Sequence, residues 1–409
     1  MTGPAAIAPI ALRPGPALHR DAVPLWVIFG LAMAPVAALG LARFAYALLL
    51  PAMRADLGWS FADAGAMNTA NAAGYLAGAL AVAPMGRRFG DKGVFAFGLL
   101  ATSLAIGAQG LTGNFMGLLA IRALAGVSGA LCFISGAGLT AAAAVGGSRS
   151  RAPTLFSIYF AGAGAGVAAS ALVVPPLLAG MGWRAGWFVL GAVSLAATLF
   201  AGFALARAPR TTYADERGEG GWSARFMACE MVAYGLFGAG YIAYATFIIA
   251  YLRSDLAFSS GMVTAFWATL GLSTVAAAFV WGPILARLRG GWGAVTTIGL
   301  VTAGAGLPVI LPNTLAAFVS AVLFGGSFLA VVAAVTSFAR RAARPHAWTT
   351  AIAALTVVFG LGQCVGPLLS GMLSDGPAGV RAGLWLSAAI LLAGTLVAAF
   401  QPEPELNEE

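Results

Sequence analysis

Twelve long apolar runs, separated by short polar gaps, occupy most of this 409-residue chain. Each run has about the 20 residues that an α-helix needs to cross the hydrocarbon core of a bilayer. Hydrophobic residues make up 60% of the sequence and charged residues 9%, whereas a soluble domain carries roughly 25% charged residues. The pattern therefore predicts an all-α membrane protein with twelve transmembrane helices and no room for a sizeable soluble domain.

The runs fall into two sets of six. The first set spans residues 24–50, 62–84, 93–111, 115–145, 152–178 and 186–205. The second set spans residues 224–252, 262–285, 293–311, 315–338, 348–373 and 382–400. We expect an N-terminal six-helix half at 24–206 and a C-terminal six-helix half at 223–400, joined by a cytoplasmic linker at 207–222. Residues 1–23 are expected to form a disordered cytoplasmic tail, and residues 401–409 an acidic one.

The distribution of basic residues predicts the orientation of the chain. With the N-terminus inside, sixteen of the 22 basic residues fall in inside segments: Arg13, Arg20, Arg87, Arg88, Lys92, Arg149, Arg151, Arg207, Arg210, Arg217, Arg225, Arg287, Arg289, Arg340, Arg341 and Arg344. Only Arg54, Arg184, Arg253 and Arg381 fall on the opposite face. The positive-inside rule therefore places both termini in the cytoplasm. Because these arginines flank apolar runs and form no single basic face, nucleic acid is not an expected partner.

Small residues recur at helical spacing inside several runs. Gly126 follows Arg122 by one turn on the same face of the fourth run. The fifth and eleventh runs hold further small or helix-breaking residues, namely Gly162, Gly164, Gly166, Gly366 and Pro367. Such positions let neighbouring helices approach closely.

Six plus six helices with these motifs resemble the major facilitator superfamily over residues 24–400. The resemblance implies two halves that rock about a central site, with the glycine-rich stretches at the moving contacts. It also implies a gating loop after the second helix, where this chain has Arg87, Arg88 and Asp91. Here the chain departs from the family pattern, because Arg87 stands where an acid is expected and Asp91 follows Gly90.

Only three charged side chains lie well inside the apolar runs: Arg43, Arg122 and Glu230. A charge inside a membrane is costly and marks a functional site by default. In the fold that the chain resembles, the helices that carry these three residues line the central cavity. A guanidinium fork matches a carboxylate, so Arg43 and Arg122 are predicted to bind an anionic substrate. The other interpretation is that each arginine bonds to carbonyls and locks the bundle.

Tyrosines accompany these charges. Tyr46 shares the face of Arg43 and could add a hydroxyl donor. Tyr234 and Tyr241 follow Glu230 along one face of the seventh run, which fits either a binding wall or plain packing. Two interpretations also fit Glu230: a proton carrier, or a fixed salt bridge to Arg225 or another cytoplasmic arginine.

Other chemistry is excluded by what the sequence lacks. There is no Ser/His/Asp set, nucleotide loop or Cys/His metal spacing, and the three cysteines lie far apart in apolar runs. The chain is therefore not predicted to be an enzyme or to need a cofactor or metal. Asn68, Asn71 and Gln363 are polar residues within the runs that need partners, but their spacing specifies no ligand.

The sequence as a whole predicts a monomeric transporter in a bacterial inner membrane. Its partners would be the lipid bilayer, a proton and a small organic anion, whose binding to the two arginines would be favoured when Glu230 is protonated. One alternative is proton-antiport efflux of hydrophobic or cationic compounds. Another is a membrane sensor or scaffold that transports nothing.

Overall fold

The computed structural model describes residues 23–145, 151–209 and 221–404, and all regular secondary structure in these ranges is helical. Most of the predicted linker at 207–222 and of the two predicted tails lies outside the described residues, as do Arg13, Arg20, Arg149, Arg210 and Arg217. Within the described ranges, eleven helices are long and apolar enough to cross a membrane.

The N-terminal half begins with one long span whose winding changes along its length. This span consists of α1 (Leu25–Leu31), α2 (Met33–Pro35), the π-helix η1 (Val36–Phe44) and α3 (Tyr46–Leu57). The other helices of this half are α4 (Phe61–Ala108), α5 (Phe115–Val145), α6 (Arg151–Gly180) and α7 (Gly182–Arg207).

The C-terminal half contains one broken span. Its elements are α8 (Ala228–Ser254), α9 (Ser260–Leu285), α10 (Trp292–Ile310), α11 (Thr314–Gly325), α12 (Phe328–Ala342), the short η2 (Pro345–Ala347), α13 (Trp348–Ser374) and α14 (Gly379–Ala398). The helix predicted at 315–338 is thus two helices, α11 and α12, interrupted at Gly326 and Ser327.

The second and third predicted helices form one element, α4, which bends sharply at Gly90. Gly90 has φ 73° and ψ 152°, a conformation that is not helical and that glycine adopts at little cost. A straight helix of 48 residues would be about 72 Å long, more than twice the roughly 30 Å of a bilayer core. The eleven spans therefore agree with twelve predicted crossings only if α4 crosses on each side of Gly90, which is our interpretation of the bend.

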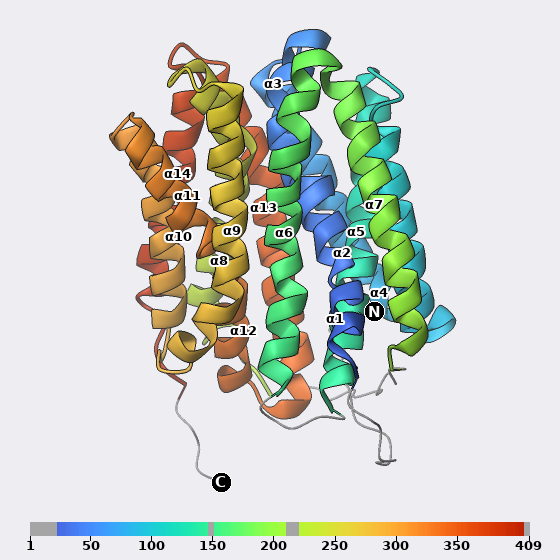
Figure 1. Cartoon of the computed structure of the whole chain (residues 1–409). Coiled ribbons are helices and arrows are strands. Elements are labelled where there is room, and N and C mark those ends of the chain that lie inside the picture. The colour runs from blue at the N-terminus through green and yellow to red at the C-terminus, as the bar shows by residue number, and fades with distance from the viewer. Residues whose placement is uncertain (1–22, 146–150, 210–220, 405–409) are drawn as a thin grey trace, which may run out of the picture.

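The two halves lie side by side. In Figure 1, α1–α7 occupy the right of the bundle and α8–α14 the left, with α6 and α9 packed against each other at the centre. The chain enters α1 and leaves α14 at the same end of the bundle, the lower end in Figure 1, as an even number of crossings requires. We call this the inner end, and the opposite one the outer end.

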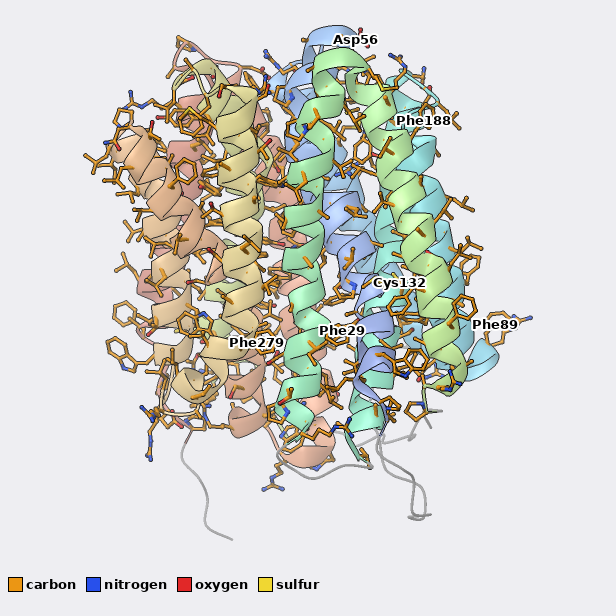
Figure 2. The ribbon with its side chains drawn as sticks, in the orientation of Figure 1. Phe29, Asp56, Phe89, Cys132, Phe188 and Phe279 are labelled. Atoms are coloured by element: carbon orange, nitrogen blue, oxygen red, sulfur yellow. The ribbon has the colours of Figure 1, made fainter. Side chains whose placement is uncertain are left out.

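The outer surface of the bundle is apolar. Phe29, Phe89, Phe188 and Phe279 are 45–59% exposed, and Figure 2 shows Phe89 projecting away from the helices. Cys132, by contrast, is completely buried within the N-terminal half. Large exposed apolar side chains on a helical bundle suit contact with lipid. The polar groups with the most specific contacts accordingly lie inside, where the two halves meet.

Candidate functional site

Arg43 lies in the last turn of η1, where the first span is wound as a π-helix. Pro35, just before this segment, has no N–H to donate, and the Ala45 N–H bonds five residues back to the Gly40 carbonyl at 3.0 Å. Such segments are rare and occur frequently at functional sites. Arg43 is only 5% exposed, so the winding presents a charged side chain to the interior.

The Arg43 guanidinium bridges the two halves. Its Nε donates to Asn71 Oδ1 of α4 at 3.0 Å, and its Nη1 donates to Gln363 Oε1 of α13 at 3.4 Å. The Tyr75 ring centroid lies 5.0 Å from the guanidinium carbon. The third nitrogen, Nη2, is buried and has no hydrogen-bond partner. Arg43 therefore has one strong donor left for a ligand.

Arg122 has a different environment, because protein atoms bind all three of its nitrogens. Its Nε donates to the Met67 carbonyl at 3.2 Å, its Nη1 to the Ala42 carbonyl at 2.6 Å, and its Nη2 to Asn68 Oδ1. The Tyr46 ring centroid lies 4.5 Å from its guanidinium carbon. Arg122 is 1% exposed. Its contacts join η1, α4 and α5, and they leave no donor nitrogen unpaired.

A polar network connects these arginines to the C-terminal half. Asn71 Nδ2 donates to the Arg122 carbonyl at 3.1 Å, and Asn68 Nδ2 donates to Thr246 Oγ1 of α8 at 2.6 Å. Gln363 Nε2 donates to the Tyr241 hydroxyl, also on α8. Charged, amide and hydroxyl groups from five spans thus meet in one buried layer at the junction of the halves. We call it the central layer; its members are Arg43, Asn68, Asn71, Arg122, Tyr241, Thr246 and Gln363.

Among the described residues, no carboxylate neutralises the two arginines. Neither guanidinium forms a salt bridge there, and the ion pairs in this part of the chain include Arg184–Asp56 and Arg341–Glu403. Burying a charge without an opposite charge is costly unless hydrogen bonds compensate it. This compensation is complete for Arg122 and incomplete for Arg43. The layer therefore carries positive charge that described carboxylates do not balance.

The three predicted tyrosines are all buried. Tyr46 donates its hydroxyl to the Ala64 carbonyl at 2.9 Å, so its proton is used within the N-terminal half. Tyr241 receives a bond from Gln363 in the central layer. The Tyr234 ring stacks on Phe359 of α13, with centroids 4.5 Å apart. Tyr241 thus lies beside Arg43 and Gln363, whereas Tyr234 lies two turns closer to the inner end.

Glu230 does not join the arginines. It is in the first turn of α8, eleven residues or roughly 16 Å of helix from Tyr241. The prediction of an acid deep in the seventh helix is wrong, because the apolar run starts at Ala224 but the helix starts only at Ala228. The carboxylate is 1% exposed, its Oε2 has no hydrogen-bond partner, and Arg341 is the charge that acts on it electrostatically.

The C-terminal residues fix the surroundings of Glu230. Gln401 Oε1 accepts from the Glu230 N–H at 3.0 Å, and Gln401 Nε2 donates to the Phe226 carbonyl at 2.9 Å. Glu403 forms an ion pair with Arg341 at 3.4 Å. No ion pair between Glu230 and Arg225 occurs among the described residues. The start of the predicted acidic tail is therefore packed against the inner end of the C-terminal half.

The predicted packing residues lie at close helix contacts. A Cβ on any of the glycines would overlap main-chain atoms of a neighbouring helix. The contacts are Gly126 with Asn71, Gly162 with Ala32, Gly164 with Gly271, Gly166 with Val36, and Gly366 with Ala239, while the Pro367 carbonyl lies against Gly65. The contacts of Gly164 and Pro367 join the two halves, whereas that of Gly366 lies within the C-terminal half.

The predicted gating residues lie at the bend of α4. Arg87 and Arg88 are exposed immediately before Gly90, and Asp91 is buried immediately after it. These three residues are far from the central layer along the helix, since Asn71 precedes Arg87 by sixteen positions. Any effect of these residues on the central layer would therefore have to pass along α4.

Sequence reasoning noted Asn68, Asn71 and Gln363 as polar residues without assigning them a ligand, and it did not note Tyr75. Asn68, Asn71 and Tyr75 are spaced by three and four residues on α4, which places them on one face. That spacing was a usable signal. Nothing local in the sequence marks Thr246 or pairs Gln363 with Arg43, because the partners lie 178 and 320 positions apart.

The fold and the central layer define a polytopic transporter built from two helical halves around a charged centre. The family model described as "Uncharacterised MFS-type transporter YbfB" matches residues 35–399. The chain therefore belongs to the major facilitator superfamily, whose members are transporters and not enzymes. No curated protein matches the chain as a relative.

Solved structures with the same fold have low sequence identity to this chain. A bacterial homologue of the human lysosomal transporter Spinster, crystallised in an inward-facing and occupied conformation, is 16% identical with a TM-score of 0.71, and the match covers 93% of this chain and 97% of that one. The nucleoside transporter NupG is 12% identical with a TM-score of 0.68, covering 92% and 96%. At these identities the likeness shows the fold alone.

Proposed function

We propose that this protein carries a small organic anion across the membrane and that Arg43 binds the anionic group. The observation that supports this most directly is the buried, unpartnered Nη2 of Arg43, in a layer with two guanidinium groups and no carboxylate among the described residues. A charge-assisted hydrogen bond to a carboxylate is roughly twice as strong as a neutral one. An anion would therefore complete the site.

Arg122 and Tyr46 would position the site in this proposal. Arg122 fixes η1 against α4 and α5 through three hydrogen bonds, and its positive charge adds to that of Arg43. Tyr46 packs on Arg122 and bonds to Ala64. Tyr241, beside Gln363, would contact the anion directly, and Tyr234 would line its path from the inner end.

Efflux of hydrophobic cations, the alternative considered from the sequence, is less compatible with this layer. A cation would add a third positive charge next to two that are already buried, and like charges repel strongly at low dielectric. A scaffold that transports nothing would not need an unpaired arginine donor at the junction of its moving halves.

Transport would follow the alternating-access scheme of the family. Two of the contacts that join the halves lie on the outer side of the arginines: Asn68 to Thr246, and the Thr69 hydroxyl to the Cys364 carbonyl at 2.6 Å. The outer end would open when these contacts break. We further propose that the protein works as a monomer in a bacterial inner membrane, with the inner end and both termini in the cytoplasm.

Proton coupling through Glu230 would be indirect. Since Glu230 is buried near Arg341 and Gln401 and not beside Arg43, its protonation would change the charge balance at the inner ends of α8 and α12. The coupling would then act on the movement of the C-terminal half and not on the anion itself.

The proposal is tested by thermal denaturation of the purified protein with a panel of carboxylates, phosphate esters and lipophilic cations. A ligand that binds only the folded state adds about 2.7 kcal/mol at one hundred times its Kd. We expect carboxylates to stabilise the wild type and to lose that effect in Arg43→Gln. Stabilisation by cations alone would contradict the proposal.

A further inference from the structure

Aromatic rings lie one helical turn toward the inner end from the polar groups that surround Arg43. On α4, Tyr75 follows Asn71 by four residues toward the inner end, and on α13, Phe359 precedes Gln363 by four residues in the same direction. On α8, Phe237 precedes Tyr241 by four. Four residues correspond to about 6 Å of helix rise. Three helices from both halves thus repeat one arrangement: a polar group beside Arg43 and a ring one turn further in.

The rings of the C-terminal half form a parallel stack. Phe359 lies 5.8 Å from Phe237 and 5.8 Å from Tyr241, with planes 14° and 10° apart, and 4.5 Å from Tyr234 at 10°. Phe237 and Tyr241 are 4.8 Å apart at 15°. Offset parallel stacking is favourable between aromatic rings. The stack therefore has a defined plane direction that another flat ring could continue.

The opposite wall belongs to the N-terminal half. Tyr75 lies against the Arg43 guanidinium and beside Phe133 of α5, at 5.0 Å and 6.4 Å. The only ring contacts of Tyr75 and Phe133 among the described residues are within their own half. Tyr75, Phe133 and Phe359 are all partly exposed, although they lie in the middle of their helices. These rings can therefore contact a ligand that lies between the halves.

Two groups of the layer can still donate a hydrogen bond. Arg43 Nη2 has no partner, and the Tyr241 hydroxyl accepts from Gln363 without donating to any described residue. A carboxylate could accept from both groups, one oxygen from each. On the outer side the Asn68–Thr246 bond closes the layer, so the rest of such a ligand must extend toward the rings.

We propose that the transported anion is an aromatic carboxylate, bound with its carboxylate on Arg43 Nη2 and its ring between Tyr75 and Phe359. This inference rests on the proposed anion transport and specifies its substrate class. The spacing of about 6 Å suits a ring separated from the carboxylate by two carbon atoms. The orientation is fixed: the charged end lies toward the outer end of the protein and the ring toward the inner end.

Three matched probes test the proposal on the purified full-length protein by calorimetric titration: 3-phenylpropanoate, 3-cyclohexylpropanoate and 3-phenylpropanamide. The cyclohexyl acid keeps the charge and is more apolar, so simple hydrophobic burial favours it. Ring stacking reverses that order, and we expect the phenyl acid to bind roughly three- to tenfold more tightly. The uncharged amide should bind at least tenfold more weakly than the phenyl acid.

Variants test whether the preference for the phenyl acid over the cyclohexyl acid depends on the rings of Phe359 and Tyr75. Phe359→Leu keeps an apolar side chain but removes the ring, and should bring the affinity ratio of the two acids close to one. Phe279→Leu is the matched control, because Phe279 is 51% exposed on the outer surface of α9 and should leave the ratio unchanged. If Phe359→Leu folds poorly, Tyr75→Leu on the opposite wall provides the same measurement.

The outcomes separate this inference from the proposed function. If both acids bind equally and Arg43→Gln abolishes both, the anion proposal stands and the aromatic class is wrong. If the amide binds as tightly as the phenyl acid, the ring site exists but the anion proposal fails, and with it the aromatic carboxylate. If no probe binds at millimolar concentration, both are overturned. A phenyl preference that Phe359→Leu or Tyr75→Leu removes supports both.

Discussion

The two buried arginines of the central layer differ in how completely their guanidinium nitrogens are hydrogen-bonded. Arg122 is held by Met67, Ala42 and Asn68, whereas Arg43 retains a free nitrogen. A buried acceptor that loses its donor costs about 1–3 kcal/mol. Their side chains are therefore expected to respond differently to the same substitution.

We predict that Arg122→Lys destabilises the protein and that Arg43→Lys does not. A lysine carries one ammonium and cannot reach three acceptors arranged for a guanidinium fork, so Arg122→Lys leaves buried oxygens unpaired. Arg43→Lys should fold normally but lose stabilisation by carboxylates. Melting temperatures in detergent, with and without ligand, measure both effects. Equal melting temperatures for the two variants would contradict the distinction between a locking and a binding arginine.

A second prediction at this scale concerns Glu230. If its protonation drives movement of the C-terminal half, Glu230→Gln should abolish accumulation driven by a pH gradient while substrate exchange between the two sides continues. Glu403→Gln is a suitable control, since Glu403 also lies near Arg341 but is partly exposed. Transport into proteoliposomes measures both activities. Loss of exchange as well would identify a structural role for Glu230.

The sequence predicted which charges are buried but not which of them meet. Arg43 and Arg122 could be placed in the interior because a charge within a long apolar run is visible in one dimension. Which arginine has all its nitrogens hydrogen-bonded could not be predicted. It depends on Ala42, Met67 and Asn68, which place a carbonyl or amide oxygen within bonding distance of Arg122 and not of Arg43. Glu230 was placed too deep because the apolar run extends beyond the helix that contains it.

At the scale of helices, one side chain joins the two halves at the outer end by bonding to helix-terminal amides. Asp375, at the C-terminal end of α13, accepts from the Phe61 N–H at 2.7 Å and the Ala62 N–H at 3.0 Å. These are the first amides of α4, which have no partner within the helix, and a carboxylate is favourable at this positive end. The contact must break whenever the outer end opens.

We predict that Asp375→Asn lets the outer end open more often. An asparagine can accept from one amide only, and its own NH₂ group repels the other. In a background without native cysteines, labelling of Ala250→Cys by an impermeant thiol reagent should accelerate roughly two- to fivefold, as the loss of a charge at a helix terminus implies. Asp56→Asn is the control, because Asp56 pairs with Arg184 inside one half. Unchanged labelling in Asp375→Asn would exclude this role.

Helix positions were largely predictable from the sequence, but the irregular backbone was not. Hydrophobic length predicts where the spans lie, and each of the eleven spans among the described residues overlaps a predicted run. The π-wound η1 and the break between α11 and α12 have no hydrophobic signature. Both irregularities lie where the halves meet, since Phe44 at the end of η1 contacts Phe328 at the start of α12 with centroids 5.3 Å apart.

For the whole molecule, orientation in the membrane follows from charge and can be measured directly. The basic residues that the structure describes near the inner end include Arg287 and Arg340, and Arg253 is among the few near the outer end. Insertion favours positive loops on the cytoplasmic side, so the inner end should face the cytoplasm.

The last prediction uses two exposed positions in a background without Cys132, Cys229 and Cys364. Ser254→Cys lies at the outer end of α8, and Ala286→Cys lies at the inner end of α9. An impermeant maleimide should label Ser254→Cys in intact cells and Ala286→Cys only after permeabilisation. The reverse pattern would invert the molecule in the membrane. It would then place the carboxylate end of the proposed substrate toward the cytoplasm, so the direction from which the rings are reached depends on this result.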